Sequence, residues 1–167
     1  RGPDSTGYAV YGKPNEGDYI MRLKVAEAED MRRGRGIHQT ILDRVDAVEA
    51  ILIEHGAEIK EKENSTDYAL RYVLGHGGDT AKMAEHIEET DGVEILSLGN
   101  GLELIKDLGD ASDVAGLYGL NDFKGTHSIG HTRMATESDV DIRSAHPYWA
   151  FPYNDVSVVH NGQITNY

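Results

Sequence analysis

Several features that are common in globular proteins are missing from this chain. Its 167 residues include no cysteine, so it can form no disulfide. No apolar run approaches the roughly 20 residues needed to span a bilayer, and the sequence shows no signal peptide. Basic residues are scarce: 16 Lys and Arg stand against 29 Asp and Glu, for a net charge of −13. Because a phosphate-binding surface needs a basic footprint, nucleic acids and anionic membranes are disfavoured as partners. Since the sequence shows neither a signal peptide nor a cysteine, we expect a cytoplasmic protein.

The composition that is present suits a folded protein. Hydrophobic residues make up 39% and charged residues 27% of the chain, which is an ordinary globular balance. The length fits one domain, or one domain that carries an insertion. The chain opens at Arg1 in an apparent turn before a strand and stops at Tyr167 just after a strand and turn, so we expect it to be part of a longer protein.

Hydrophobic periodicity predicts the main elements. Apolar residues recur every three or four positions over 37–55, which indicates an amphipathic helix that Gly56 ends. A second helix is expected over 80–89, with Asp79 as its N-cap. Over 18–25 the pattern alternates, with apolar residues on one face and the basic Arg22 and Lys24 on the other. Further elements are expected as strands at 7–12, 57–63, 67–74 and on both sides of the Asn100-Gly101 turn, and as a short helix at 113–118.

The order of these elements predicts the domain organisation. Residues 18 to 107 follow the order β-α-β-β-α-β-β, which favours a split βαβ sandwich as in ferredoxin-like folds. We interpret 18–119 as an inserted α/β subdomain between two pieces of another domain, 1–17 and 120–167. The predicted fold class is α+β.

Four motifs could carry chemistry: "RGPDSTG" at 1–7, "GHTRMATES" at 130–138, "AHP" at 145–147 and "HNGQITN" at 160–166. Each has a plainer structural interpretation. The first could be a turn with an Asp cap, and Arg133 could form a surface ion pair. Asn161-Gly162 alone is more typical of a hairpin turn, because both residues tolerate positive φ.

In combination, the motifs resemble those of class II glutamine amidotransferases, which are N-terminal-nucleophile (Ntn) hydrolases. Within them the chain is most similar to the glutamate-synthase-like branch, which includes the N-methylglutamate synthase amidotransferase subunit. The resemblance implies part of a four-layer αββα sandwich that the α/β subdomain interrupts. It also implies an enzyme that releases ammonia from glutamine and passes it by a shielded route to a synthase subunit. In that branch the synthase carries flavin and iron–sulfur centres; we expect no cofactor and no metal in this chain, and the number of copies stays open.

The resemblance assigns roles to particular residues. In glutamine hydrolysis the nucleophile attacks the side-chain amide and forms a thioester, which water then hydrolyses. Arg133 is expected to hold the substrate α-carboxylate, which the planar guanidinium can bind through both oxygens, and Thr136 to line the same pocket. Asn161, through its side-chain amide, and Gly162, through its backbone N–H, are expected to form the oxyanion hole.

Further residues are expected to support the site. His146 matches a family position near the pocket, with an ordering role as plausible as contact with substrate. "RGPDSTG" matches the stretch beside the nucleophile, and its residues Arg1, Gly2 and Asp4 are expected to support that wall.

The chain also departs from the family pattern. The family's nucleophile is an N-terminal cysteine, with its α-amine as the base, and these 167 residues contain no cysteine. We expect that motif upstream, and an aspartate for the substrate α-amine downstream of Tyr167. Met134 and Glu137 stand where many relatives carry Trp and His. We therefore predict that residues 1–167 alone cannot hydrolyse glutamine.

Three alternatives remain open. The absence of a nucleophile is compatible with a non-catalytic scaffold or regulatory subunit, although a scaffold has no need of both a carboxylate clamp and an oxyanion hole. "LGHGGDTAK" (74–82) could bind a phosphate, but it lacks the Gly-Lys-Ser/Thr ending. A zinc site is the third alternative and is disfavoured: in a strand, residues four apart lie about 13 Å from one another, and core or pocket positions are more typical of the histidines concerned, His127, His131, His146 and His160.

Overall fold

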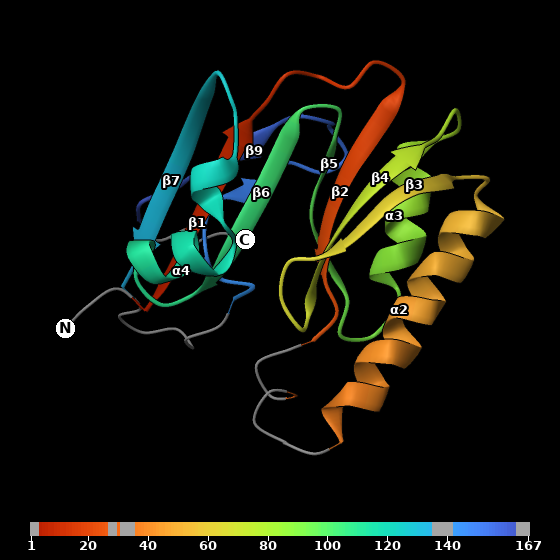
Figure 1. Ribbon diagram of the computed structural model, residues 1–167, viewed down its shortest axis with the longest axis horizontal. Coiled ribbons are helices and arrows are strands. Elements are labelled where there is room, and N and C mark those ends of the chain that lie inside the picture. The colour runs from red at the N-terminus through yellow and green to blue at the C-terminus, as the bar shows by residue number, and fades with distance from the viewer. Residues whose placement is uncertain (1–3, 27–29, 31–35, 135–141, 163–167) are drawn as a thin grey trace.

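A computed structural model of the chain describes residues 4–26, 30, 36–134 and 142–162 (Figure 1). Within these residues the fold contains helices and three antiparallel sheets, so the class is α+β, as the sequence predicts. None of the helices described there is long and apolar enough to cross a bilayer. In chain order the elements are β1 Ser5–Tyr11, β2 Asp18–Lys24, α2 Ile37–Glu54, β3 Glu58–Asn64, β4 Ala69–Gly75, α3 Thr80–Glu88, β5 Glu94–Gly99, β6 Leu102–Leu108, α4 Ala111–Leu117, the 3-10 turn η1 Leu120–Asp122, β7 His127–Arg133, β8 Tyr148–Trp149 and β9 Ser157–Val158.

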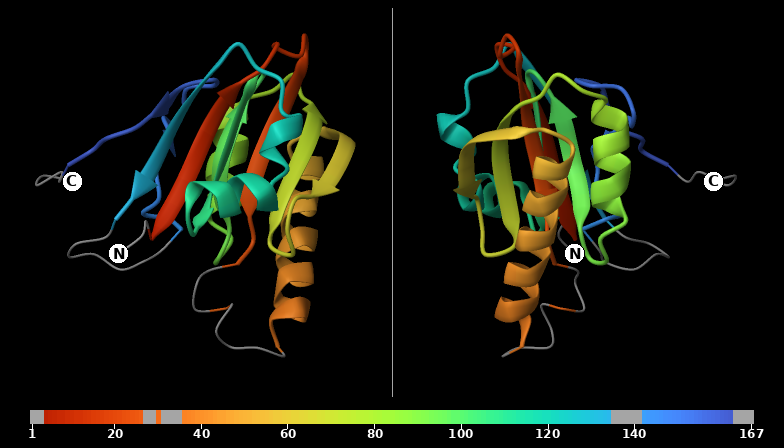
Figure 2. Two further views of the ribbon diagram at one scale, coloured as in Figure 1. Left: turned by 60° about the vertical axis from the view of Figure 1, so that its left-hand side comes forward. Right: turned by 90° about the vertical axis from the view of Figure 1, so that its right-hand side faces the viewer.

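The four-stranded sheet has the topology that the element order predicts. Its strand order is β3-β4-β2-β5, and every neighbouring pair is antiparallel. Each helix connects two strands that a third strand separates: α2 leads from β2 to β3 across β4, and α3 leads from β4 to β5 across β2. This is the split βαβ arrangement. Figure 2 shows both helices on one face of this sheet.

The main hydrophobic core lies between these helices and the sheet. From α2 it takes the apolar stripe that includes Val48 and Leu52, and from α3 it takes Met83 and Ile87, all of them at most 1% exposed. Both predicted helix ends are confirmed. Gly56 has a φ of 72°, which favours glycine after the end of α2. The Asp79 side chain accepts hydrogen bonds from the backbone N–H groups of the first turn of α3.

The second sheet brings distant parts of the chain together. Its order is β6-β1-β7, so the amino-terminal strand β1 lies between β6 and β7 (Figure 1). β5 and β6 follow one another through the tight Asn100-Gly101 turn but belong to different sheets. The division of the chain into 1–17 with 120–167 and 18–119 remains a prediction, and β6 joins the two parts in one sheet.

The basic residues of β2 are buried and form ion pairs. Arg22 is 4% exposed and Lys24 is 2% exposed. Arg22 binds the Glu103 carboxylate of β6 with nitrogen–oxygen distances of 2.6 and 2.8 Å, and Lys24 binds Glu94 at 2.9 Å. The alternation in β2 thus separates two buried faces, one apolar and one ionic.

Candidate functional site

Asp4, one residue of the predicted amino-terminal wall, lies beside Arg133, the predicted carboxylate clamp. β1 and β7 pair antiparallel with Ser5 opposite Arg133, and the Asp4 N–H donates to the Arg133 carbonyl at 2.8 Å. The sheet ladder therefore fixes the start of β1 against the end of β7. Three other predicted residues lie outside the described part of the chain: Arg1, Gly2 and Thr136.

A row of residues across the second sheet forms a seat for the segment that carries His146. Lys106, Gly7 and His131 are opposite one another on β6, β1 and β7. A Cβ atom at Gly7 would overlap the His146 carbonyl oxygen, so the missing side chain lets this backbone approach the sheet. The His146 ring lies 4.8 Å from the ring of His131 and 4.6 Å from that of Tyr148, measured between centroids.

His146 is an uncharged side chain in a basic environment. Burial, which is the largest cause, and the positive electrostatic environment of His131, Arg133, Lys106 and His160 together lower the pKa of His146 from 6.5 to about 4. His146 is consequently neutral near pH 7. Arg133 and His160 thus act electrostatically on the same imidazole, although the two residues come from different parts of the chain.

The predicted oxyanion donors directly follow His160. Both Asn161 and Gly162 are exposed to solvent. Gly162 has a φ of 152°, a conformation that side chains rarely adopt, and a Cβ atom there would lie 3.1 Å from the His160 ring. Asn161 has no positive φ, so the pair is not the type I′ hairpin turn that its sequence suggests. Arg133 and His160, the residue just before this motif, both act electrostatically on His146.

Asp155 anchors the loop that leads to the motif. Its carboxylate accepts hydrogen bonds from the backbone N–H groups of Asn100, Gly101 and Leu102 at 2.8–3.0 Å. Asp155 has a φ of 57°, a strained value for a non-glycine residue. One carboxylate thus ties the small β8-β9 sheet to the turn between β5 and β6.

The histidines of β7 have aromatic neighbours. The His127 ring stacks on that of Tyr11, with centroids 4.4 Å apart and an angle of 8° between the planes. His131 faces His146 at the other end of the strand. Within the described ranges, the structure has no group of three or more His, Cys, Asp or Glu side chains that could hold a metal ion.

Comparison with curated proteins reveals relatives along the whole chain. It is 37% identical over 171 aligned residues to a protein of Methanothermobacter thermautotrophicus (strain Delta H) named "Putative glutamine amidotransferase", covering 100% of this chain and 53% of that protein. It is 32% identical over 167 residues to the glutamine amidotransferase-like protein GlxB of Rhizobium meliloti (strain 1021), covering 100% and 50%. A glutamine–fructose-6-phosphate aminotransferase of Streptococcus pyogenes serotype M6 is 39% identical over 69 residues, or 41% of this chain and 11% of that protein. The chain belongs to a class II glutamine amidotransferase domain.

This amidotransferase sequence spans about half the length of the first two relatives. No family model matches it. The similarity to the aminotransferase covers less than half of the chain, whereas the first two relatives match it throughout.

Sequence reasoning missed several residues that build this part of the amidotransferase domain. Gly7 and Lys106 support the His146 segment, and Asp155 anchors the loop before Asn161. Each acts on a partner more than 30 positions away in the chain, so no local pattern could indicate it. A core or pocket position was favoured for His131 over a zinc site, but its contact with His146 depends on the approach of that segment to the sheet.

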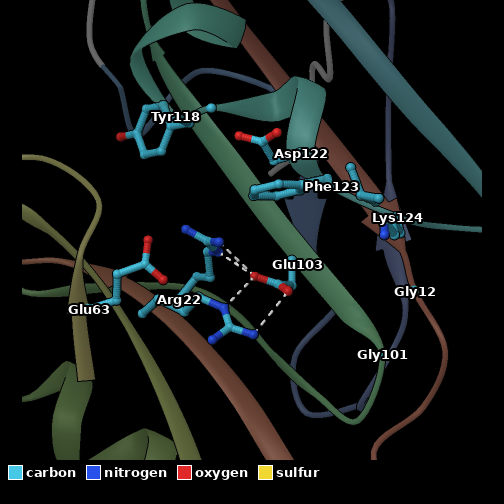
Figure 3. Close-up of a pocket in the computed structure, with 12 residues that line it drawn as sticks. Gly12, Arg22, Glu63, Gly101, Glu103, Tyr118, Asp122, Phe123 and Lys124 are labelled. Atoms are coloured by element: carbon cyan, nitrogen blue, oxygen red, sulfur yellow. Dashed lines mark hydrogen bonds and ion pairs between the residues drawn. The ribbon is translucent and has the colours of Figure 1, made fainter. Parts of the chain in front are cut away.

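A cavity of about 400 Å³ lies at the other end of β1 (Figure 3). Arg22 and Arg71 are opposite one another on β2 and β4, and both bind the carboxylate of Glu103. Phe123 lies over Arg22, with 5.1 Å between the ring centroid and Cζ. None of the predicted site residues that the structure describes lines this cavity. Its lining comprises Val10, Gly12, Arg22, Glu63, Arg71, Gly101, Glu103, Tyr118, Gly119, Asp122, Phe123 and Lys124.

Proposed function

We propose that this chain supplies the substrate-binding wall and the oxyanion hole of a glutaminase that releases ammonia for a synthase partner. The observation that carries the proposal is that Arg133 and His160 both act electrostatically on His146, and that Asn161 and Gly162 directly follow His160 in the chain. An amidotransferase needs a fixed cation for the α-carboxylate of glutamine and amide donors where the oxyanion forms. In this proposal Arg133 supplies the cation, and Asn161 and Gly162 supply the donors.

In this proposal each residue has a separate task. Arg133 binds the α-carboxylate through two parallel hydrogen bonds, and Thr136 lines the same pocket. The Asn161 side-chain amide and the Gly162 N–H stabilise the tetrahedral oxyanion. Neutral His146 orders the pocket without adding charge beside Arg133. The supporting wall beside the nucleophile is then formed by Arg1, Gly2 and Asp4.

The wider setting belongs to the same proposal. The nucleophile would be a cysteine of the full-length protein, since residues 1–167 contain none. We infer that the sheets form part of a four-layer αββα Ntn-hydrolase sandwich, with 18–119 as its insertion, in a cytoplasmic protein of the glutamate-synthase-like branch. Residues 1–167 alone should release no ammonia from glutamine.

Steady-state kinetics of the full-length protein test these roles separately. Arg133→Lys should raise KM for glutamine, because an ammonium cannot reproduce the two-pronged contact. Asn161→Ala should lower kcat on the order of 10²- to 10³-fold, because the lost donor acts on the transition state. Thr132→Ser is the matched control, since Thr132 is the exposed neighbour of Arg133 on β7, and it should leave both constants unchanged. A full-length wild-type protein that folds but does not hydrolyse glutamine would refute the proposal and favour the scaffold.

A further inference from the structure

A buried lysine of the second sheet holds the segment that carries His146. Lys106 is 3% exposed and lies on β6. Its ammonium donates to the Arg143 carbonyl at 3.3 Å and lies 5.0 Å from the centroid of the Tyr148 ring. The two contacts fall three positions before and two positions after His146, so one side chain contacts the chain both before and after this residue.

The Lys106 ammonium also forms a buried ion pair. Glu94 of β5 binds Lys106 at 3.0 Å through one carboxylate oxygen and binds Lys24 at 2.9 Å through the other. Burial opposes the ionisation of Glu94, but the two lysines outweigh it and lower the pKa of its carboxyl. A buried carboxylate between two buried ammonium groups is a rigid ionic cluster, because the loss of either partner leaves a desolvated charge.

The contacts of Lys106 serve more than charge balance. Lys24 neutralises the same carboxylate and is as deeply buried, but within the described part of the chain its ammonium forms an ion pair with Glu94 and has no described contact with residues 143–148. Lys106 extends the cluster to the 143–148 segment and lies in the cross-strand row with Gly7 and His131, on which His146 is seated. The ammonium therefore determines how closely this segment lies against the sheet.

We propose that Lys106 is a positioning residue for the glutamine site: together with Glu94 it clamps residues 143–148 so that His146 stays against His131 and beside Arg133. This inference rests on the proposed function and adds to it a residue that does not touch the substrate. Displacements of about 1 Å in a supporting group can reduce catalysis on the order of a hundredfold. We expect a loss of catalysis of this kind when the Lys106 ammonium is removed.

The test compares two lysines that share one carboxylate. Lys106→Met and Lys24→Met, made in the full-length protein, each remove one buried ammonium from Glu94 and keep the aliphatic stem. Lys106→Arg restores a cation at the clamp. The three variants are compared with wild type by thermal unfolding, by the NMR titration of His146 and by kcat and KM for glutamine.

We expect the two methionine variants to lose similar stability but to differ at the site. Lys106→Met should shift the His146 titration upward from about 4 toward 6.5, because it removes a nearby positive charge and loosens the segment. It should lower kcat/KM on the order of tenfold to a hundredfold, and Lys106→Arg should recover most of that loss. Lys24→Met should leave both the titration and kcat/KM close to wild type.

Two results would overturn the inference. One is an equal loss of activity in both methionine variants, which would reduce Lys106 to a structural role. The other is an unchanged His146 titration in Lys106→Met. The titration needs no catalysis, so it tests the clamp even where the wild-type protein shows no glutaminase activity and the proposed function fails.

Discussion

Gly7→Ala perturbs the seat of the His146 segment with a single methyl group. The added Cβ would overlap the His146 carbonyl oxygen and would lie 2.8 Å from Lys106 Cβ and 3.0 Å from the Ile105 carbonyl oxygen. These atoms belong to backbone or to the base of a buried side chain, so none of them can rotate away. Either the 143–148 segment lifts from the sheet or β1 shifts within it.

The expected loss of stability follows from two opposing effects. Overfilling a well-packed site costs about 1–3 kcal/mol, and a clash with backbone belongs at the upper end. Alanine also restricts the unfolded chain, which recovers about 0.4–1 kcal/mol. The free energy of unfolding should therefore fall by about 2 kcal/mol.

Urea denaturation of Gly7→Ala beside Gly130→Ala measures this difference. Gly130 lies on the paired strand opposite Tyr8, where a Cβ would lie 3.2 Å from Cδ1 of that ring. A ring edge can move, and Gly130 is exposed, so the control should change stability by less than about 0.5 kcal/mol. Equal midpoints for Gly7→Ala and wild type, at unchanged m-value, would show that the segment does not rest on Gly7.

Three further perturbations have defined outcomes. Glu103→Gln should lower the free energy of unfolding by about 3 kcal/mol in chemical denaturation, because it leaves Arg22 buried beside Arg71 without a countercharge; a change below about 1 kcal/mol would contradict this. Asp155→Ala should lower the melting temperature by several degrees, since a loss of about 2 kcal/mol follows when three backbone N–H groups lose a charged acceptor; an unchanged melting temperature would show that water replaces the carboxylate. The pKa of His146 is lower in the folded protein, so its protonation favours the unfolded chain, and the associated stability should be present above pH 6.5 and lost between pH 6.5 and about 4; His146→Gln should flatten the stability profile in that window, and an unaltered profile would refute the assignment.

Local patterns predicted much of the fold. The three-to-four spacing of apolar residues located α2, and the cap at Asp79 located the start of α3. The element order was enough for the split βαβ sheet, because few topologies satisfy two crossovers of this kind. These features depend on residues that are close in sequence.

The residues that cover the basic face of β2 could not be predicted in this way. Alternation separated Arg22 from its apolar neighbours but could not indicate what would cover it, and the covering residue Glu103 lies 81 positions away. The same limit applies to Gly7, whose requirement for glycine comes from the backbone of His146. The site motifs were singled out by their combined resemblance to a known family, and their roles stay predictions, whereas the residues that support the His146 segment depend on tertiary contacts alone.

In the proposed site, Arg133 and the Asn161-Gly162 pair bind one and the same amino acid. A crystal structure of the full-length protein with L-glutamate, the product of glutamine hydrolysis, tests it most directly. We expect the α-carboxylate on the Arg133 guanidinium and a side-chain oxygen within hydrogen-bonding distance of the Asn161 amide and the Gly162 N–H. Glutamate bound instead in the Arg22–Arg71 cavity, or an Arg133 that points away from the bound ligand, would contradict it.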